Sequence, residues 1–284
     1  MTIRTTCIGM GRYVGTLCMA AALVIGTPHF SKPVWAANAG DSVYMEELTW
    51  QEIKNKLRTG TVTVIVPSGG LEQSGPQLIT GKQNIIVRAA AGQIAHGVNG
   101  LVAPVIAYSP EGRIDPPEGH MQFPGTISIS EKTYGDILEQ TAESLKQNGF
   151  RYICFIGEHS GTQGVQQQVA DKLSSMWRSE GVRVINVSAY YNRNGLEEWS
   201  EAAGIHVPAP EAHAGHIETS EMMALDPAGV RDNLRSAYTE RDYKTTGAMG
   251  DSSKASAKYG RRYIGLKQEA AIKQIKNAIS IDER

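Results

Sequence analysis

The chain has 284 residues, of which 28 are basic and 29 acidic, so its formal net charge is −1. This balance argues against nucleic acid as a partner, because a nucleic-acid-binding protein needs a surplus of lysine and arginine. The length allows one large domain with a substantial core.

The first 39 residues have the features of a secretory signal peptide. Arg4 and Arg12 precede an apolar run at 13–25, and small residues follow at 36–39. This order is typical of an export signal. A transmembrane anchor is the alternative, but the run is shorter than the roughly 20 residues that span a bilayer. We therefore expect a periplasmic or secreted protein that keeps no membrane segment after cleavage.

Removal of residues 1–39 changes the charge and the cysteine count. Three of the 28 basic residues leave with this segment and none of the 29 acidic residues does, so 25 basic residues remain and the net charge becomes −4. Cys154 is the cysteine that remains, and it lies in an apolar run, which is typical of a buried and inert thiol. We expect a single domain at 40–284.

Apolar runs alternate with helical patterns along this domain. Strands are predicted at 61–67, 101–108, 126–129, 150–156 and 182–187, and helices at 49–57, 84–96, 130–147, 163–178, 192–204, 211–225 and 258–279. This alternation predicts an α/β fold, a three-layer α/β/α sandwich with a mainly parallel sheet. Pro104 interrupts the second strand, which favours an edge position or a bulge there.

Glu72 follows the first strand in a loop of turn residues. Ligands of open α/β sheets bind beyond the carboxyl ends of the strands, so we expect Glu72 at the mouth of a site. A solvated glutamate in an ordinary turn is the alternative. The long polar connection at 109–125 contains His120, and a loop of this kind is usually functional or disordered.

Two further polar clusters contain metal-ligating residue types. Glu158 and His159 follow a predicted strand, and His213 and Glu218 open a predicted helix. Carboxylate and imidazole are ligands of hydrolytic zinc or manganese sites, which keep one position open for water. Each cluster also has a structural explanation: His159 as a buried, hydrogen-bonded histidine, and Glu218 as an acid that favours a helix N-terminus.

Five motifs in this order resemble the creatininase (creatinine amidohydrolase) family. They are Gly70-Leu-Glu72-Gln-Ser-Gly-Pro76, His120-Met-Gln-Phe-Pro124-Gly-Thr126, Glu158-His159-Ser-Gly161, His213-Ala-Gly-His-Ile-Glu218-Thr-Ser220 and Gly250-Asp-Ser-Ser-Lys-Ala-Ser256. The resemblance runs from about residue 48 to the last helix. It implies an α/β/α sandwich, commonly a homohexamer, which hydrolyses C–N bonds, often of cyclic amides, with a metal pair at the carboxyl ends of the strands.

The resemblance also implies roles for individual residues. Glu72, His159 and Glu218 match positions that look like the metal ligands of the family. His213 matches a position near the scissile bond that serves as acid or base, and Glu158 is the second catalytic candidate. The candidates for substrate binding are His120, Ser74, Gln77 and Gln83.

Two positions depart from the family pattern. Ser74 stands where the usual pattern has histidine, and Gln83 stands where it has the bridging aspartate. Exported relatives that resemble this chain instead carry histidine at the positions of Gln77 and Gln83, and aspartate at that of Glu158. Glutamine is a poor ligand for zinc compared with imidazole or carboxylate. We therefore expect one zinc or manganese ion rather than two, or none.

The leading hypothesis is an exported amidohydrolase that uses a metal-activated water on a C–N bond, other than a peptide bond, of a small polar substrate. The first alternative is a non-catalytic protein of the same fold, which binds a small polar ligand or a partner in a metal-depleted pocket. The second is a metal-free enzyme with Glu72 and His159 as an acid/base pair.

Overall fold

The structure is a computed structural model, and it describes residues 41–205 and 213–282. The predicted signal segment at 1–39 lies outside the described residues, so cleavage and export stay predictions. The start of the helix predicted at 211–225 also lies partly outside them. Within the described residues, no helix combines the length and the apolar character needed to cross a membrane.

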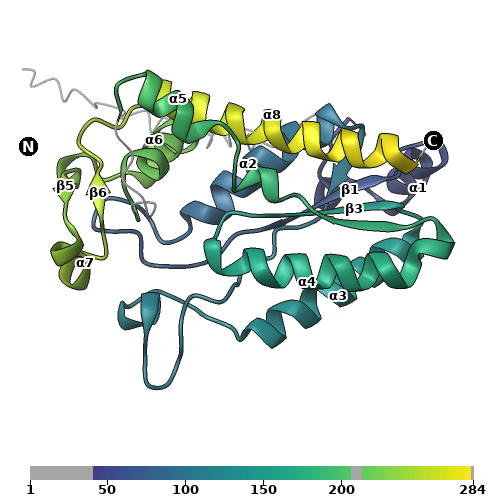
Figure 1. Ribbon diagram of the computed structural model, residues 1–284, viewed down its shortest axis with the longest axis horizontal. Helices are drawn as coiled ribbons and strands as arrows, with labels where there is room; N and C mark the ends of the chain where they lie inside the picture. The colour runs from purple at the N-terminus through teal and green to yellow at the C-terminus, as the bar shows by residue number, and fades with distance from the viewer. Residues whose placement is uncertain (1–40, 206–212, 283–284) are drawn as a thin grey trace, which may run out of the picture. The chain divides into compact units, whose positions relative to one another are not determined.

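Four parallel strands form the central sheet in the order β2-β1-β3-β4 (Figure 1). The strands are β1 (Thr63–Ser68), β2 (Gly100–Val102), β3 (Tyr152–Gly157) and β4 (Arg183–Asn186). β1 is buried along its whole length, as expected for a strand that is covered on both faces. A separate antiparallel pair is formed by β5 (Ala237–Tyr238) and β6 (Gly250–Asp251).

Helices cover both faces of the sheet. They are α1 (Trp50–Arg58), α2 (Lys82–Gly97), α3 (Glu131–Asn148), α4 (Ser160–Trp177), α5 (Leu196–Ala202), α6 (His216–Leu225), α7 (Glu240–Thr246) and α8 (Ala257–Asp282). α2 and α8 lie on one side of β1 and β3, and α3 and α4 lie on the other (Figure 1). Because neighbouring side chains of a strand point to opposite faces, Val64 packs toward α3 and α4 whereas Ile65 packs toward α2 and α8. The predicted three-layer sandwich is confirmed.

Local sequence signals set several element ends. Thr49 and Glu52 form the expected capping box at the start of α1. Gly149 ends α3 in the left-handed conformation, with φ of 106°. β2 is an edge strand, as Pro104 predicted, but it ends at Val102 and is shorter than the strand predicted at 101–108. Cys154 is fully buried in β3, and burial raises the pKa of its thiol to about 12.

The strand predicted at 126–129 is wrong. Ile127 and Ser128 form isolated bridges with Leu71 and Ser109, which lie in loops, and no continuous ladder forms. The side chain of Ile127 is 44% exposed although it is apolar, so the burial that favours a core strand is missing. This segment instead holds the loops of the site against each other.

The connections around β1 and β3 create the place for a ligand. α2 follows β1 on one face of the sheet, and α4 follows β3 on the other face, although the two strands are neighbours. The loops that leave their carboxyl ends therefore diverge, and an open crevice is expected at such a switch point. The Glu72 loop follows β1, and His159 follows β3.

Gly260 allows α8 to cross α6 closely. A Cβ atom at this position would lie 1.8 Å from the backbone oxygen of Ser220, whereas at Gly265 in the same helix the nearest atom lies 4.0 Å away.

We predict that Gly260→Ala lowers the free energy of unfolding by about 3 kcal/mol or more, through overpacking. Gly265→Ala should leave it unchanged or raise it by up to about 1 kcal/mol, because alanine favours a helix. Urea unfolding followed by circular dichroism measures both, and equal midpoints would contradict this packing of α8 on α6.

Candidate active site

A cavity of about 1460 Å³ lies beyond the carboxyl ends of β1 and β3. One part of its lining comes from polar side chains of the candidate residues, namely Glu72, Gln83, His120, Glu158, His159, His213 and Glu218. Another part comes from the segment after β4, at 188–201, and from α8. Four of the five family-like motifs thus meet at one place.

Glu72 lies at the centre of these groups, and its two carboxylate oxygens have different neighbours. Oε1 accepts hydrogen bonds from Lys82 Nζ at 3.0 Å and from Gln83 Nε2 at 2.7 Å. Oε2 faces His120 Nε2 at 3.2 Å and His159 Nε2 at 3.4 Å. Burial would raise the pKa of Glu72, but Lys82 and the histidines outweigh it, so this pKa lies well below its usual value.

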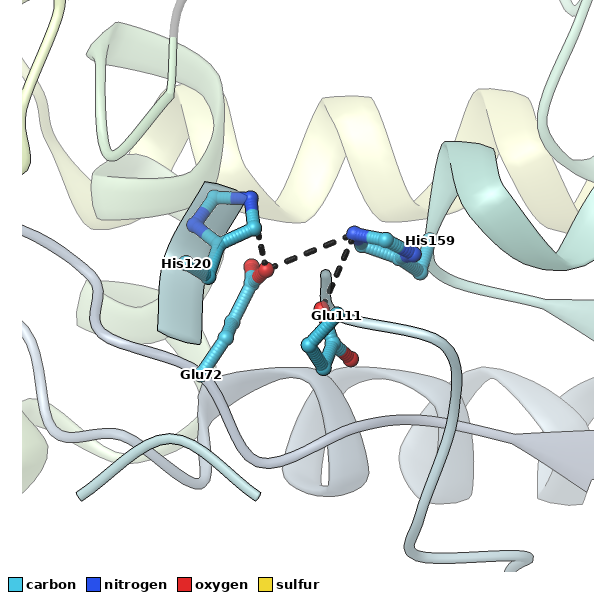
Figure 2. A group of neighbouring side chains, drawn as sticks. All are labelled: Glu72, Glu111, His120 and His159. Atoms are coloured by element: carbon cyan, nitrogen blue, oxygen red, sulfur yellow. Dashed lines mark ion pairs between the residues drawn. The ribbon is translucent and has the colours of Figure 1, made fainter. Parts of the chain in front are cut away.

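Glu72 shares its Oε2 side with Glu111, His120 and His159, which we call the first cluster (Figure 2). The ligand atoms of the four side chains lie within 4.8 Å of one another. Glu72 Oε2 and Glu111 Oε2 are buried and accept no well-aligned hydrogen bond from the described residues, although imidazole Nε2 atoms lie 3.0–3.4 Å from them. A buried carboxylate oxygen without a well-aligned donor is costly, so this arrangement favours a cation between the two oxygens.

Neighbouring groups orient the two imidazole rings of the first cluster. The backbone N–H of Gly161 donates to His159 Nδ1 at 3.1 Å, so the proton of the neutral His159 ring lies on Nε2, which faces Glu111 Oε2 at 3.0 Å. His120 Nδ1 lies 3.0 Å from Gln73 Nε2 and 3.2 Å from the Tyr243 hydroxyl. These contacts turn the Nε2 atoms of both rings toward the carboxylates.

The surroundings shift the pKa values of this cluster. Burial lowers the pKa of His120 to about 4, so this ring is neutral and can act as a metal ligand near pH 7. Burial and the charge of Glu72 raise the pKa of Glu111 to about 7 despite the opposing effect of His159. Burial would lower the pKa of His159, but its contacts with Glu72 and Glu111 raise it above its usual value.

A second cluster consists of Glu72, His213 and Glu218, and Lys82 lies against it. Lys82 Nζ is 2.6 Å from Glu218 Oε1 and 3.0 Å from Glu72 Oε1. The lysine is fully buried, which by itself would lower its pKa. The charges of Glu218 and Glu72 overcome this effect and raise the pKa above its usual value, so Lys82 stays protonated.

The backbone around His213 is fixed by its own neighbours. Ala214 has a positive φ of 54°, which is uncommon for a residue with a side chain. Its N–H donates to Glu218 Oε2 at 2.5 Å, and its carbonyl accepts a hydrogen bond from Gln77 Nε2. His213 Nε2 donates to the Gln73 carbonyl at 2.8 Å. Because a carbonyl only accepts, Nδ1 of the neutral ring carries no proton, and it lies 3.8 Å from Glu72 Oε1.

Glu158 belongs to a different charge network at the cavity wall. Its Oε1 lies 2.6 Å from Lys267 Nζ, and its Oε2 accepts a hydrogen bond from the Tyr190 hydroxyl. Lys267 also contacts Glu221 at 2.9 Å, and burial raises the pKa of Glu221 to about 8. The carboxylate of Glu158 therefore accepts a hydrogen bond at each oxygen, whereas Glu72 Oε2 and Glu111 Oε2 accept none of good geometry.

The structure places the other candidate residues as follows. Glu72 and His159 share the first cluster, whereas Glu218 lies in the second. Among the candidates for substrate binding, His120 and Gln83 line the cavity, but Ser74 and Gln77 are buried and are not among its described lining residues. Ser74 Oγ donates to the Glu72 carbonyl at 3.3 Å, and Gln77 Nε2 donates to the Ala214 carbonyl. Both side chains therefore bind backbone carbonyl groups.

Two residues of the site were missed from the sequence. Glu111 lies in the polar connection at 109–125, whose length was the available signal. Lys82 is adjacent to Gln83, and no local pattern distinguishes it from a surface lysine at the start of a helix. Its burial depends on Glu72 and Glu218, which lie elsewhere in the chain.

Curated relatives match much of the chain. A 3-dehydro-scyllo-inosose hydrolase of Thermotoga maritima is 26% identical over 185 residues, which is 65% of this chain and 57% of that protein. A mycofactocin precursor peptide peptidase of Mycobacterium tuberculosis is 24% identical over 246 residues, 78% of this chain and 87% of that protein. A creatinine amidohydrolase of Pseudomonas putida is 26% identical over 196 residues, 66% of this chain and 73% of that protein.

Solved structures have the same fold. A manganese creatininase superposes with a TM-score of 0.69 at 20% identity, and a creatininase mutant described as Zn–Zn type superposes with a TM-score of 0.70 at 21% identity. Each alignment covers 84% of this chain and 98% of the other. A family model described as creatinine amidohydrolase matches residues 46–275. This match covers most of the chain and shows that it belongs to the creatininase family.

Proposed function

We propose that the protein is an exported amidohydrolase that hydrolyses a C–N bond, other than a peptide bond, of a small polar substrate with the aid of one zinc or manganese ion. The reaction class is supported by the family, whose curated relatives carry the names of hydrolases. Export rests on the N-terminal sequence, and assembly as a homohexamer rests on the resemblance to the family. Both belong to the proposal.

The observation that carries the proposal is the pair of buried oxygens, Glu72 Oε2 and Glu111 Oε2, that accept no well-aligned hydrogen bond and lie beside two imidazole nitrogens. Together with the neutral His120 ring they have the chemistry of a site for a divalent transition metal. His159 Nε2 completes this set, and binding through it displaces the proton that the ring carries in the metal-free form. The first cluster therefore suits one ion.

The second cluster does not suit an ion. Both of its carboxylates contact the ammonium of Lys82, which is fully buried and stays protonated. A divalent ion at the same oxygens would lie next to a positive charge in a medium of low dielectric constant. The geometry thus supports one ion rather than a pair.

The side chains assign the proton transfers of the proposed reaction. A bound zinc or manganese ion supplies a Lewis acid that lowers the pKa of water toward neutrality. The unprotonated Nδ1 of His213 would accept the proton that the attacking water loses and donate it to the leaving nitrogen. Glu72 Oε1, 3.8 Å from Nδ1, stabilises the charged ring between these two transfers.

We predict that the protein purified without chelator contains about one equivalent of zinc or manganese, as a single site with protein ligands requires. Glu111→Gln should lose most of this metal, because it removes a buried anionic ligand. Glu118→Gln is the matched control: it lies in the same loop, is exposed and pairs with Arg113, and should keep the metal. Elemental analysis after gel filtration measures all three proteins.

A metal content that stays far below one equivalent, without gain on addition of zinc or manganese, would reject the metal-dependent reaction. The activity test is hydrolysis of a panel of cyclic and linear amides, before and after chelation. Turnover that survives chelation would indicate a metal-free acid/base enzyme. Binding of a panel member without turnover would indicate a non-catalytic protein of this fold.

His213→Gln should lower kcat by about 10²–10⁴-fold, because it removes the proton-transferring group. The metal content should remain unchanged, since His213 lies outside the first cluster. His96→Gln, an exposed histidine at the end of α2, is the control and should retain full activity. Steady-state kinetics with elemental analysis distinguish a loss of proton transfer from a loss of metal. An unchanged kcat in His213→Gln would exclude His213 as the proton-transferring group.

A further inference from the structure

Lys82 is a fully buried cation at the first position of α2. The N-terminus of a helix carries partial positive charge, which disfavours lysine at this position. The ammonium is instead held by Glu218 Oε1 at 2.6 Å and by Glu72 Oε1 at 3.0 Å. The two carboxylates, rather than helix formation, therefore account for a lysine here.

The ammonium lies among groups that otherwise have the composition of a metal site. Glu72, His213 and Glu218 offer one ligand atom each within 4.8 Å of one another. Two carboxylates and one imidazole are a sufficient set of protein ligands for a zinc ion with an open position. Lys82 contacts both carboxylates of this set and balances one of their two negative charges, so the chain itself places a cation at this cluster.

The charge balance of the site also favours one divalent cation and not two. Glu72, Glu111 and Glu218 supply three negative charges when ionised, and Lys82 supplies one positive charge. One divalent cation at the first cluster neutralises the remainder. A second divalent cation would leave a net positive charge in a largely buried site, which is unfavourable.

We propose that the Lys82 ammonium takes the place of a second metal ion. It forms ion pairs with Glu72 and Glu218, keeps Glu72 Oε2 directed at the first cluster, and limits the protein to one transition-metal ion per chain. Lys82 is absent from the described residues that line the cavity, so it acts as a positioning residue. The inference rests on the proposed function for the ion of the first cluster. Its test measures the zinc that is gained at the second cluster.

The test counts the zinc ions that the metal-stripped protein binds, by isothermal titration calorimetry and by elemental analysis after dialysis. Lys82→Ala should bind one equivalent more than the wild type, because the change frees the space between Glu72, His213 and Glu218. The double variant K82A/E218Q should return to the wild-type count, since it removes a ligand of the new site.

Lys267→Ala is the matched control for the loss of a buried lysine. Lys267 is held between Glu158 and Glu221 in the same way, but no imidazole joins these carboxylates in a ligand cluster among the described residues. This variant should show no additional equivalent of zinc. An additional equivalent in Lys267→Ala, equal to that in Lys82→Ala, would show that any buried carboxylate pair that loses its lysine binds zinc. This result would overturn the inference.

The outcomes separate this inference from the proposed function. A wild type without zinc and a Lys82→Ala variant with one equivalent would reject the proposed function and support the inference. One equivalent in both the wild type and folded Lys82→Ala would overturn the inference and leave the proposed function in place, whereas no zinc in either would overturn both. Zinc should also raise the Tm of Lys82→Ala more than that of the wild type. If Lys82→Ala does not fold, Lys82→Ser is read in the same way, and failure of both to fold with zinc overturns the inference.

Discussion

The site depends on the different contacts that the two oxygens of the Glu72 carboxylate make. Oε1 is occupied by the ammonium of Lys82 and the amide of Gln83, both from the start of α2. Oε2 is thereby left to face His120 and His159. A buried carboxylate with one satisfied and one free oxygen has a fixed orientation, because turning it would cost two hydrogen bonds. The free oxygen is what makes the first cluster suitable for a cation.

Two buried lysines hold carboxylates at and near the cavity wall. Lys82 pairs with acids from the β1 loop and α6, and Lys267 on α8 pairs with Glu158 after β3 and Glu221 on α6. α6 contributes a carboxylate to each pair, so the packing of α6 between α2 and α8 couples both networks to the fold. Removal of one member of such a pair leaves an uncompensated buried charge, which is strongly destabilising.

The fold was largely predictable because its signals are local. The Val/Ile run of β1, the capping box of α1 and the glycine that ends α3 each lie within a few residues of the element they define. The segment at 126–129 shows the limit of this reasoning. Its composition is that of a strand, but no neighbouring strand lies beside it, and its contacts are single bridges to loops.

The candidate site was only partly predictable because its decisive contacts join distant parts of the chain. Glu72 and His159 were found through their position after strands. The importance of Lys82 depends on Glu218, far along the sequence, and that of Glu111 on its free oxygen. Gln77 has the polar side chain expected of a substrate-binding group, yet its amide is used by the Ala214 carbonyl. Such competition between backbone and cavity is visible only in three dimensions.

The central claim is that one external cation and one internal ammonium share Glu72. Anomalous diffraction at the zinc absorption edge, from crystals of the wild-type protein grown with zinc, tests it most directly. The account predicts one anomalous peak per chain, in contact with Glu72 Oε2 and Glu111, with the Lys82 ammonium still between Glu72 Oε1 and Glu218. A peak between Glu72 Oε1 and Glu218, with Lys82 displaced, would contradict it.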